Sequence, residues 1–121
     1  MPESARAAVI EEVRQGVTAT HGGEGTGRFT DAERMQLAAW DLGAIALHLG
    51  DQDFLFGDEP TCADASVAAV LISCATEFFD TPLTGLVRQH TNLVAYIDRM
   101  QARYFATVRW PNWPVLEAEP A

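Results

Sequence analysis

The fold is decided by the stretch FLFGDEPTCAD, which occupies residues 54–64. It opens with three apolar residues, turns at Gly57, and reaches Pro60 directly before a Thr-x-x-Asp sequence. Thr61 and Asp64 have the spacing of a capping box, in which each side chain accepts a hydrogen bond from a free backbone N–H at a helix N-terminus. The stretch therefore predicts an apolar loop that packs into the core, followed by a helix that starts at Thr61.

The residues after this capping box predict a central, buried helix. Apolar residues recur there at helical spacing, namely Val67, Val70, Leu71, Cys74 and Phe78. Small residues cover the remaining faces, and a helix that is apolar or small all round is usually buried. Pro82 follows the segment and ends the predicted helix before it.

The N-terminal part predicts a first helix over residues 3–17 and then a loop. The helix carries an apolar stripe, made of Val9, Ile10, Val13 and Val17. Residues 22–27 are rich in glycine and favour a flexible connection. Arg28 follows them and is a candidate contact for an anion at the next helix N-terminus, although the loop lacks the Gly-Lys-Ser/Thr ending of a phosphate-binding loop.

A second helix is predicted to begin at Thr30 and to end at Gly50. Thr30 and Glu33 form a second capping box in the sequence. The apolar stripe of this helix is Met35, Ala38, Leu42, Ile45 and Leu49. Gly50 stops the helix because glycine adopts the left-handed conformation without a steric cost.

The C-terminal part predicts a short helix over residues 83–88 and a final helix. The final helix carries Leu93, Tyr96, Ile97, Met100 and Tyr104. Asp98 and Arg99 lie among these residues, and we expect Arg99 to make structural polar contacts between helices. Trp110 and Trp113 alternate with prolines in the tail, which cannot be helical and either folds back over the bundle or marks a surface for a partner. The predicted fold class is therefore an all-α helical bundle of four substantial helices and one short one, with no strand pattern.

Composition restricts the class of function. The chain has 121 residues, enough for one domain, and a net charge of −9 with arginine as its only basic residue besides histidine. Such a surface repels phosphate backbones, so nucleic acid is not expected as a partner. Residues 65–76 form the longest nearly uncharged stretch and are too short to span a bilayer. The N-terminus has no secretory signal pattern, so we expect a soluble, cytoplasmic protein.

No catalytic, cofactor or metal site is predicted. Cys62 and Cys74 lie about 18 Å apart if both are on one helix, beyond the ~7 Å limit for a disulfide, so both are expected to be reduced. Cys62 lies at a helix N-terminus, where a thiol is a candidate for reactivity, but no constellation of His or Asn is predicted beside it to support catalysis. The histidines, at positions 21, 48 and 90, lack the spacing of zinc ligands.

Three phrases carry a resemblance to a known family. They are GEGTGRF at residues 23–29, FLFGDEPTCAD at residues 54–64 and HTNLVAYIDRM at residues 90–100. Their order and content resemble the C-terminal helical domain of glutathione S-transferases, in which the Ser/Thr and Asp of the second phrase cap the central helix. The first phrase is similar to the branch that contains the metaxins, the failed-axon-connections proteins and their bacterial relatives.

The resemblance implies a helical domain over residues 3–105 and a Trp- and Pro-containing tail over residues 106–121. In the family, glutathione binds to a separate, N-terminal thioredoxin-like domain, for which this sequence has no pattern. We therefore expect no cofactor, and glutathione only where such a domain is supplied elsewhere. The chain is interpreted as a truncated gene product or a naturally reduced relative. It is expected to act in dimerisation or partner binding through an apolar helix face, or to be the apolar substrate-binding side of a transferase.

Overall fold

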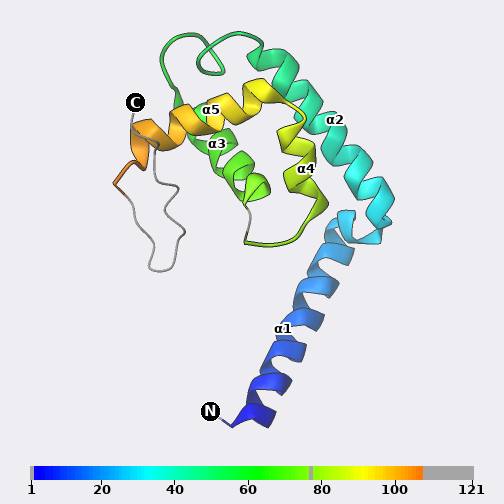
Figure 1. Ribbon diagram of the computed structural model, residues 1–121. Helices are drawn as coiled ribbons and strands as arrows, with labels where there is room; N and C mark the ends of the chain where they lie inside the picture. Colours follow the sequence, from blue (N-terminus) through cyan, green and yellow to red (C-terminus); the bar gives the residue numbers. More distant parts are fainter. Residues whose placement is uncertain (1, 77, 108–121) are drawn as a thin grey trace. The chain divides into compact units, whose positions relative to one another are not determined.

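The computed structural model of the chain describes residues 2–76 and 78–107 (Figure 1). Within these residues the chain is all-α, with no strand, as predicted. The elements are α1 (Glu3–Glu24), the 3-10 helix η1 (Thr26–Arg28), α2 (Asp31–Leu49), α3 (Cys62–Ala75), α4 (Pro82–Arg88) and α5 (Thr91–Tyr104). The tail tryptophans at positions 110 and 113 lie outside the described residues.

The chain divides into two compact units, residues 1–43 and residues 44–121. The boundary falls inside α2, so no linker separates the two units. The division of the sequence into a domain over residues 3–105 and a tail remains a prediction. The two units are described one at a time below.

In the first unit, α1 is longer than the sequence indicated. It continues from Glu3 to Glu24, so the prediction that residues 22–27 form a loop is wrong for the first part of that range. Gly22 and Gly23 stay helical, and the first glycine with a left-handed backbone is Gly25, whose φ is 101°. Glycine weakens a helix but ends it only where the backbone turns into a conformation that other residues avoid.

Gly27 is required by a close approach of the backbone. A Cβ atom built at Gly27 would lie 2.5 Å from the carbonyl carbon of His21 and 2.7 Å from the nitrogen of Gly22. Both atoms belong to the backbone of α1, so neither can move aside as a flexible side chain would. The glycine-rich segment therefore folds against the end of α1 in a fixed turn.

Within the first unit, the apolar stripe of α1 is exposed. No residue of α1 is buried. The side chains of Val9, Ile10, Val13 and Val17 are between 47% and 59% exposed. A helix that buries nothing gains no packing energy, which is the main source of helix stability in proteins.

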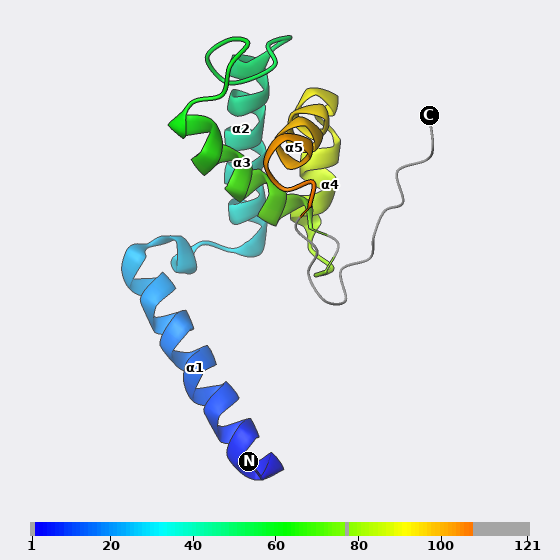
Figure 2. The same cartoon turned by 90° about the vertical axis from the view of Figure 1, so that its left-hand side faces the viewer.

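In the second unit, α3, α4 and α5 contact one another in pairs, as Figures 1 and 2 show from two sides. Their buried apolar residues join those of the end of α2 and of the loop after it. The core of this unit consists of Ala46, Leu49, Phe54, Leu55, Ala68, Leu71, Val87, Leu93, Tyr96, Ile97 and Met100. Gly50 ends α2 with a φ of 53°, as expected for a left-handed stop.

Three predictions about the core are wrong. The helix α3 ends at Ala75 and does not reach Phe78, because Thr76 is already extended. One face of α3 is open, and Val70 on it is 62% exposed, so the helix is not buried all round. Of the apolar triplet at residues 54–56, Phe56 is 66% exposed, because it lies in the two-residue turn that the paired Phe54 and Gly57 close. Its ring instead packs edge-on against the ring of His48.

We expect Gly27→Ala to disrupt the turn after α1, because its methyl group would collide with the backbone of His21 and Gly22. The measurement is hydrogen exchange at the amides of Gly25 and Arg28, which bond to the carbonyl oxygens of His21 and Gly25. Gly22→Ala is the matched control, since a Cβ there meets no atom within 4 Å. It should keep protection at both amides and add up to about 1 kcal/mol of helix stability. Equal protection in both variants would contradict the steric account.

Candidate functional site

The best-defined polar centre of the second unit is the carboxylate of Asp64, which has no exposed surface. Its Oδ1 atom accepts hydrogen bonds from the Leu55 N–H and from the Tyr96 hydroxyl, both at 2.9 Å. Its Oδ2 atom accepts the Thr61 N–H at 2.8 Å and the Thr61 hydroxyl at 3.2 Å. The capping box of Thr61 and Asp64 is present at the start of α3. One carboxylate therefore joins the loop before α3, α3 itself and α5.

The surroundings of Asp64 favour its ionised form. Burial by itself would raise the pKa of the Asp64 carboxyl, but the hydrogen bonds from Leu55, Thr61 and Tyr96 outweigh it and hold this pKa below its ordinary value. Burial and the neighbouring Asp64 carboxylate raise the pKa of the Tyr96 hydroxyl. Tyr96 therefore stays protonated at neutral pH and remains a donor to the carboxylate.

Two further side chains hold the end of α2 and the loop of residues 51–60 in place. The Nε2 atom of His48 lies 2.8 Å from the Leu55 carbonyl oxygen, which is an acceptor, so the ring donates from Nε2. Asn92, on the first turn of α5, donates from its amide to the carbonyl oxygens of Ala46 and Gly50. Sequence patterns indicated neither role, because both side chains bind backbone carbonyl oxygens, which any residue could supply. The acceptors of Asn92 are also more than 40 residues away in the chain.

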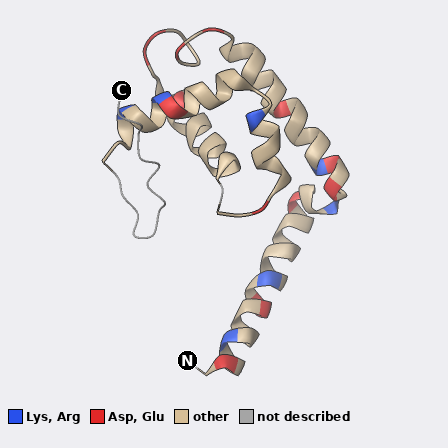
Figure 3. Ribbon diagram, viewed as in Figure 1, with Lys and Arg blue, Asp and Glu red and all other residues tan. Residues whose placement is uncertain are grey.

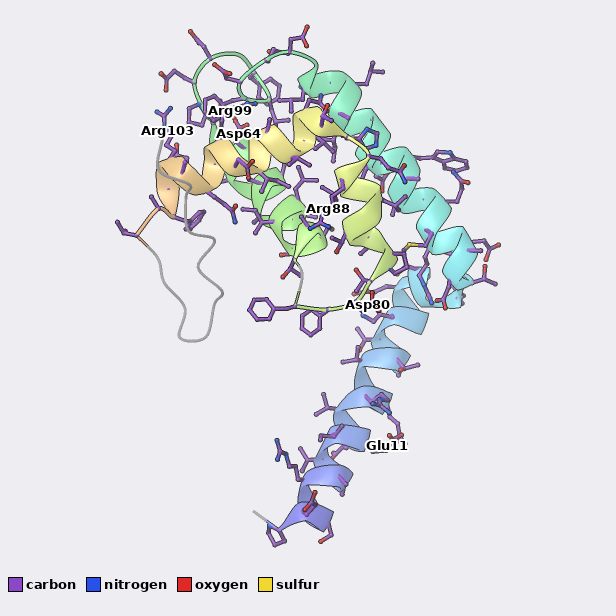
Figure 4. The ribbon with its side chains drawn as sticks, viewed as in Figure 1. Glu11, Asp64, Asp80, Arg88, Arg99 and Arg103 are labelled. Carbon is purple, nitrogen blue, oxygen red and sulfur yellow. The ribbon has the colours of Figure 1, made fainter. Side chains whose placement is uncertain are left out.

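Arg99 contacts this loop and not another helix, which corrects the prediction of polar contacts between helices. Its Nε atom donates to the Asp53 carbonyl oxygen at 3.1 Å, and its guanidinium lies 3.8 Å from the Asp53 carboxylate. Asp98 is exposed. One turn further along α5, Arg103 donates to Glu59 at 2.9 Å and lies over the Phe54 ring. Figure 4 shows Asp64, Arg99 and Arg103 gathered where α5 passes the loop.

This arrangement has the chemistry of a structural centre. The two oxygens of the Asp64 carboxylate accept four hydrogen bonds from the protein, so it has little capacity left for a substrate or a metal ion. Within residues 2–76 and 78–107, every buried side-chain polar atom has a partner. The same residues contain no cluster of His, Cys, Asp and Glu that could hold a metal ion.

The second capping box and Arg28 lie in the first unit. The Thr30 N–H donates to Glu33 at 2.7 Å, and the Glu33 N–H donates to the Thr30 hydroxyl at 3.2 Å. The backbone hydrogen bond from Thr30 lowers the pKa of Glu33. An open hollow nearby is lined by His21, Gly27 and Arg34 among others, but not by Arg28. The anion contact of Arg28 therefore stays a prediction.

The cysteines are free, and they differ in exposure. Cys62 is exposed at the first position of α3, whereas Cys74 is partly buried. Burial raises the pKa of the Cys74 thiol, which makes it a poor nucleophile at neutral pH.

No helix in the described part of the chain is long and apolar enough to cross a membrane.

Comparison with known families decides the classification. The profile of the family described as glutathione S-transferase, C-terminal domain, matches residues 38–100, which is more than half of the chain. The chain belongs to the glutathione S-transferase C-terminal domain family. The matched range contains Asp64 and the residues that donate to it, so the centre described above lies in the family region. The helix α1 lies outside that range.

A curated relative points to the same family. The isoprene-epoxide–glutathione S-transferase of Rhodococcus sp. strain AD45 is 29% identical over 82 residues, which cover 68% of this chain and 34% of the relative. The chain thus spans about a third of the length of the relative it matches. No solved structure matches the chain.

We expect Asp64→Asn to destabilise the second unit by at least about 2 kcal/mol. The amide NH₂ group is itself a donor, so it would face donors that now bind the carboxylate and would leave them without an acceptor. The measurement is the midpoint of chemical denaturation. Glu33→Gln is the matched control, because it makes the same change in the exposed capping box of α2 and should cost less. If Asp64→Asn does not fold, Tyr96→Phe removes only one of the four hydrogen bonds and should cost about 1 kcal/mol. Similar midpoints for wild type, Asp64→Asn and Tyr96→Phe would contradict the structural role of the carboxylate.

Asp64 also predicts a dependence of stability on pH. Its pKa is lower in the folded chain than in the unfolded chain, so its contribution is complete above the unfolded value, about 3.9, and is lost as the pH falls through the folded value. The melting temperature of the wild type should therefore fall on acidification below about pH 4. That of Tyr96→Phe should fall by less over the same range, because the Asp64 carboxyl without this donor has a folded pKa closer to the unfolded value, at which the loss begins in both proteins. Parallel melting curves for both proteins from pH 7 to pH 3 would refute this assignment.

Proposed function

We propose that this chain is a helical interaction module that is non-catalytic by itself and acts through dimerisation or the binding of a protein partner. The observation that carries the proposal is the exposed apolar stripe of α1, whose four large aliphatic side chains are about half exposed. Aliphatic residues recurring on one face of a long helix are typical of a surface that another protein covers.

The chemistry of the second unit supports a non-catalytic role. The perturbed groups at Asp64 and Tyr96 face each other at 2.9 Å and are fully occupied with holding the loop and two helices together. Perturbed pKa values often mark active sites, but structural networks also produce them. The contacts of Asp64 are of the structural kind, because each donor belongs to the protein itself.

A second candidate function is the C-terminal part of a glutathione S-transferase enzyme, contributing the apolar side of a substrate site. It is favoured by the similarity to the Rhodococcus isoprene-epoxide–glutathione S-transferase. In that case the partly open helix α3, whose residues after Asp64 are all uncharged, would face the substrate (Figure 3). Glutathione would then come from a thioredoxin-like domain supplied elsewhere.

Two finer parts of the proposal concern branch and location. The phrase GEGTGRF at residues 23–29 supports a place near the branch of the metaxins and failed-axon-connections proteins. In this chain, glycines of the phrase shape the turn after α1. The free cysteines support the cytoplasm, where thiols stay reduced.

The two functions differ in one assay. The purified chain should conjugate glutathione to an electrophilic aryl halide no faster than buffer does, since every buried side-chain polar atom among its described residues already has a partner within the protein. Melting of the chain should also be unchanged by millimolar glutathione. Saturable turnover by the chain alone would overturn the first function. Turnover that appears only when a thioredoxin-like domain is added would support the second.

A further inference from the structure

The exposed stripe of α1 ends in opposite charges. At about 100° per residue, Arg6 and Glu24 lie on the same face as Val9, Ile10, Val13 and Val17, within a sector about 100° wide. Arg6 is near the start of the stripe and Glu24 is the last residue of the helix. The seam is therefore apolar in the middle, positive at one end and negative at the other.

We propose that α1 pairs with α1 of a second copy of the chain, in antiparallel orientation. In an antiparallel pair, Arg6 lies opposite Glu24 of the partner subunit, and by symmetry the contact occurs twice. In a parallel pair, each of these charges would lie opposite its own copy. Opposite charges that flank an apolar seam set the orientation of two helices, and like charges disfavour the alternative.

The same alignment brings apolar residues together at the middle of the helix, while Val9 and Ile10 lie opposite His21 and Thr20 of the partner subunit. With Arg6 opposite Glu24 of the partner subunit, Val13 lies opposite Val17 of the partner subunit, and the two-fold axis passes beside position 15. Gly16 lies next to this axis, and a Cβ there would meet no atom within 4 Å of the chain. Glycine inside a helix costs about 0.5–1 kcal/mol relative to alanine, and a close approach of two helices at this point would offset that cost.

The pairing fits the energetic need of α1. The helix has 22 residues and buries none of them. In proteins, most of the stability of a helix comes from the packing of its apolar face. A two-fold symmetric seam buries the stripe of both copies with one set of contacts. One pair of helices about 33 Å long makes a small interface, so we expect a dimer that dissociates on dilution.

The test is the oligomeric state, measured by analytical ultracentrifugation over a range of protein concentrations. Wild type should form a concentration-dependent dimer. Arg6→Glu and Glu24→Arg should each raise the dimer dissociation constant about tenfold or more, because each replaces two attractive pairs by two repulsive ones. The double variant R6E/E24R should return the dissociation constant to within a few-fold of the wild-type value. Added salt should weaken the difference between these proteins.

Glu11→Arg is the matched control, since it makes the same charge change as Glu24→Arg on the opposite side of α1 (Glu11 is labelled in Figure 4). It should leave the dissociation constant unchanged, and circular dichroism should show equal helix content in all variants. A wild type that is monomeric at every concentration overturns the pairing. The pairing is also overturned if the dissociation constant of the double variant R6E/E24R does not return toward the wild-type value, because the two helices are then not antiparallel in this register.

This inference rests on the proposed interaction role, but the two can fail separately. A monomeric chain without conjugating activity overturns the pairing of α1 and leaves the role in binding another partner. Conjugating activity in the purified chain overturns the role, whatever its oligomeric state.

Discussion

The buried carboxylate of Asp64 is the interaction on which the second unit depends. Taking an ionised group out of water costs several kcal/mol, and this cost is met only when hydrogen bonds replace the lost hydration. Here the donors come from the loop before α3, from the residue that caps α3, and from Tyr96 on α5. The three segments must therefore be in place together, which gives the small helical unit one arrangement instead of several. Arg99 and His48 also hold that loop in place, because each donates a hydrogen bond to one of its carbonyl oxygens.

The parts of this centre that the sequence predicted are the local ones. Thr61 and Asp64 are three residues apart, and a capping box is set by that spacing alone. The donors Leu55 and Tyr96 are nine and 32 residues away from Asp64, so they depend on how the chain folds back on itself. The errors have the same origin. The length of α1 depended on which glycine first needed a positive φ, and the exposure of Phe56 depended on the turn that the pairing of Phe54 with Gly57 closes.

Membership of the glutathione S-transferase C-terminal domain family explains the centre at Asp64 but does not define an activity. The matched residues include the carboxylate and its donors, and these groups bind one another instead of a ligand. A relative that shares such a centre shares the means of building the domain. Similarity over about a third of an enzyme's length therefore supports a shared fold more strongly than a shared activity.

The distribution of charge separates the two halves of the chain in a way that bears on function. In the second unit, the arginines at positions 99 and 103 are used internally, on the loop and on Glu59. On α1, Arg6 has no ion pair with any described residue, and Glu24 has only the neighbouring His21 at 3.6 Å. A stripe that needed only to be hidden could be apolar throughout. Charges of opposite sign at its two ends add little to the burial energy, but they distinguish one direction of pairing from the other, which is what a specific interface requires.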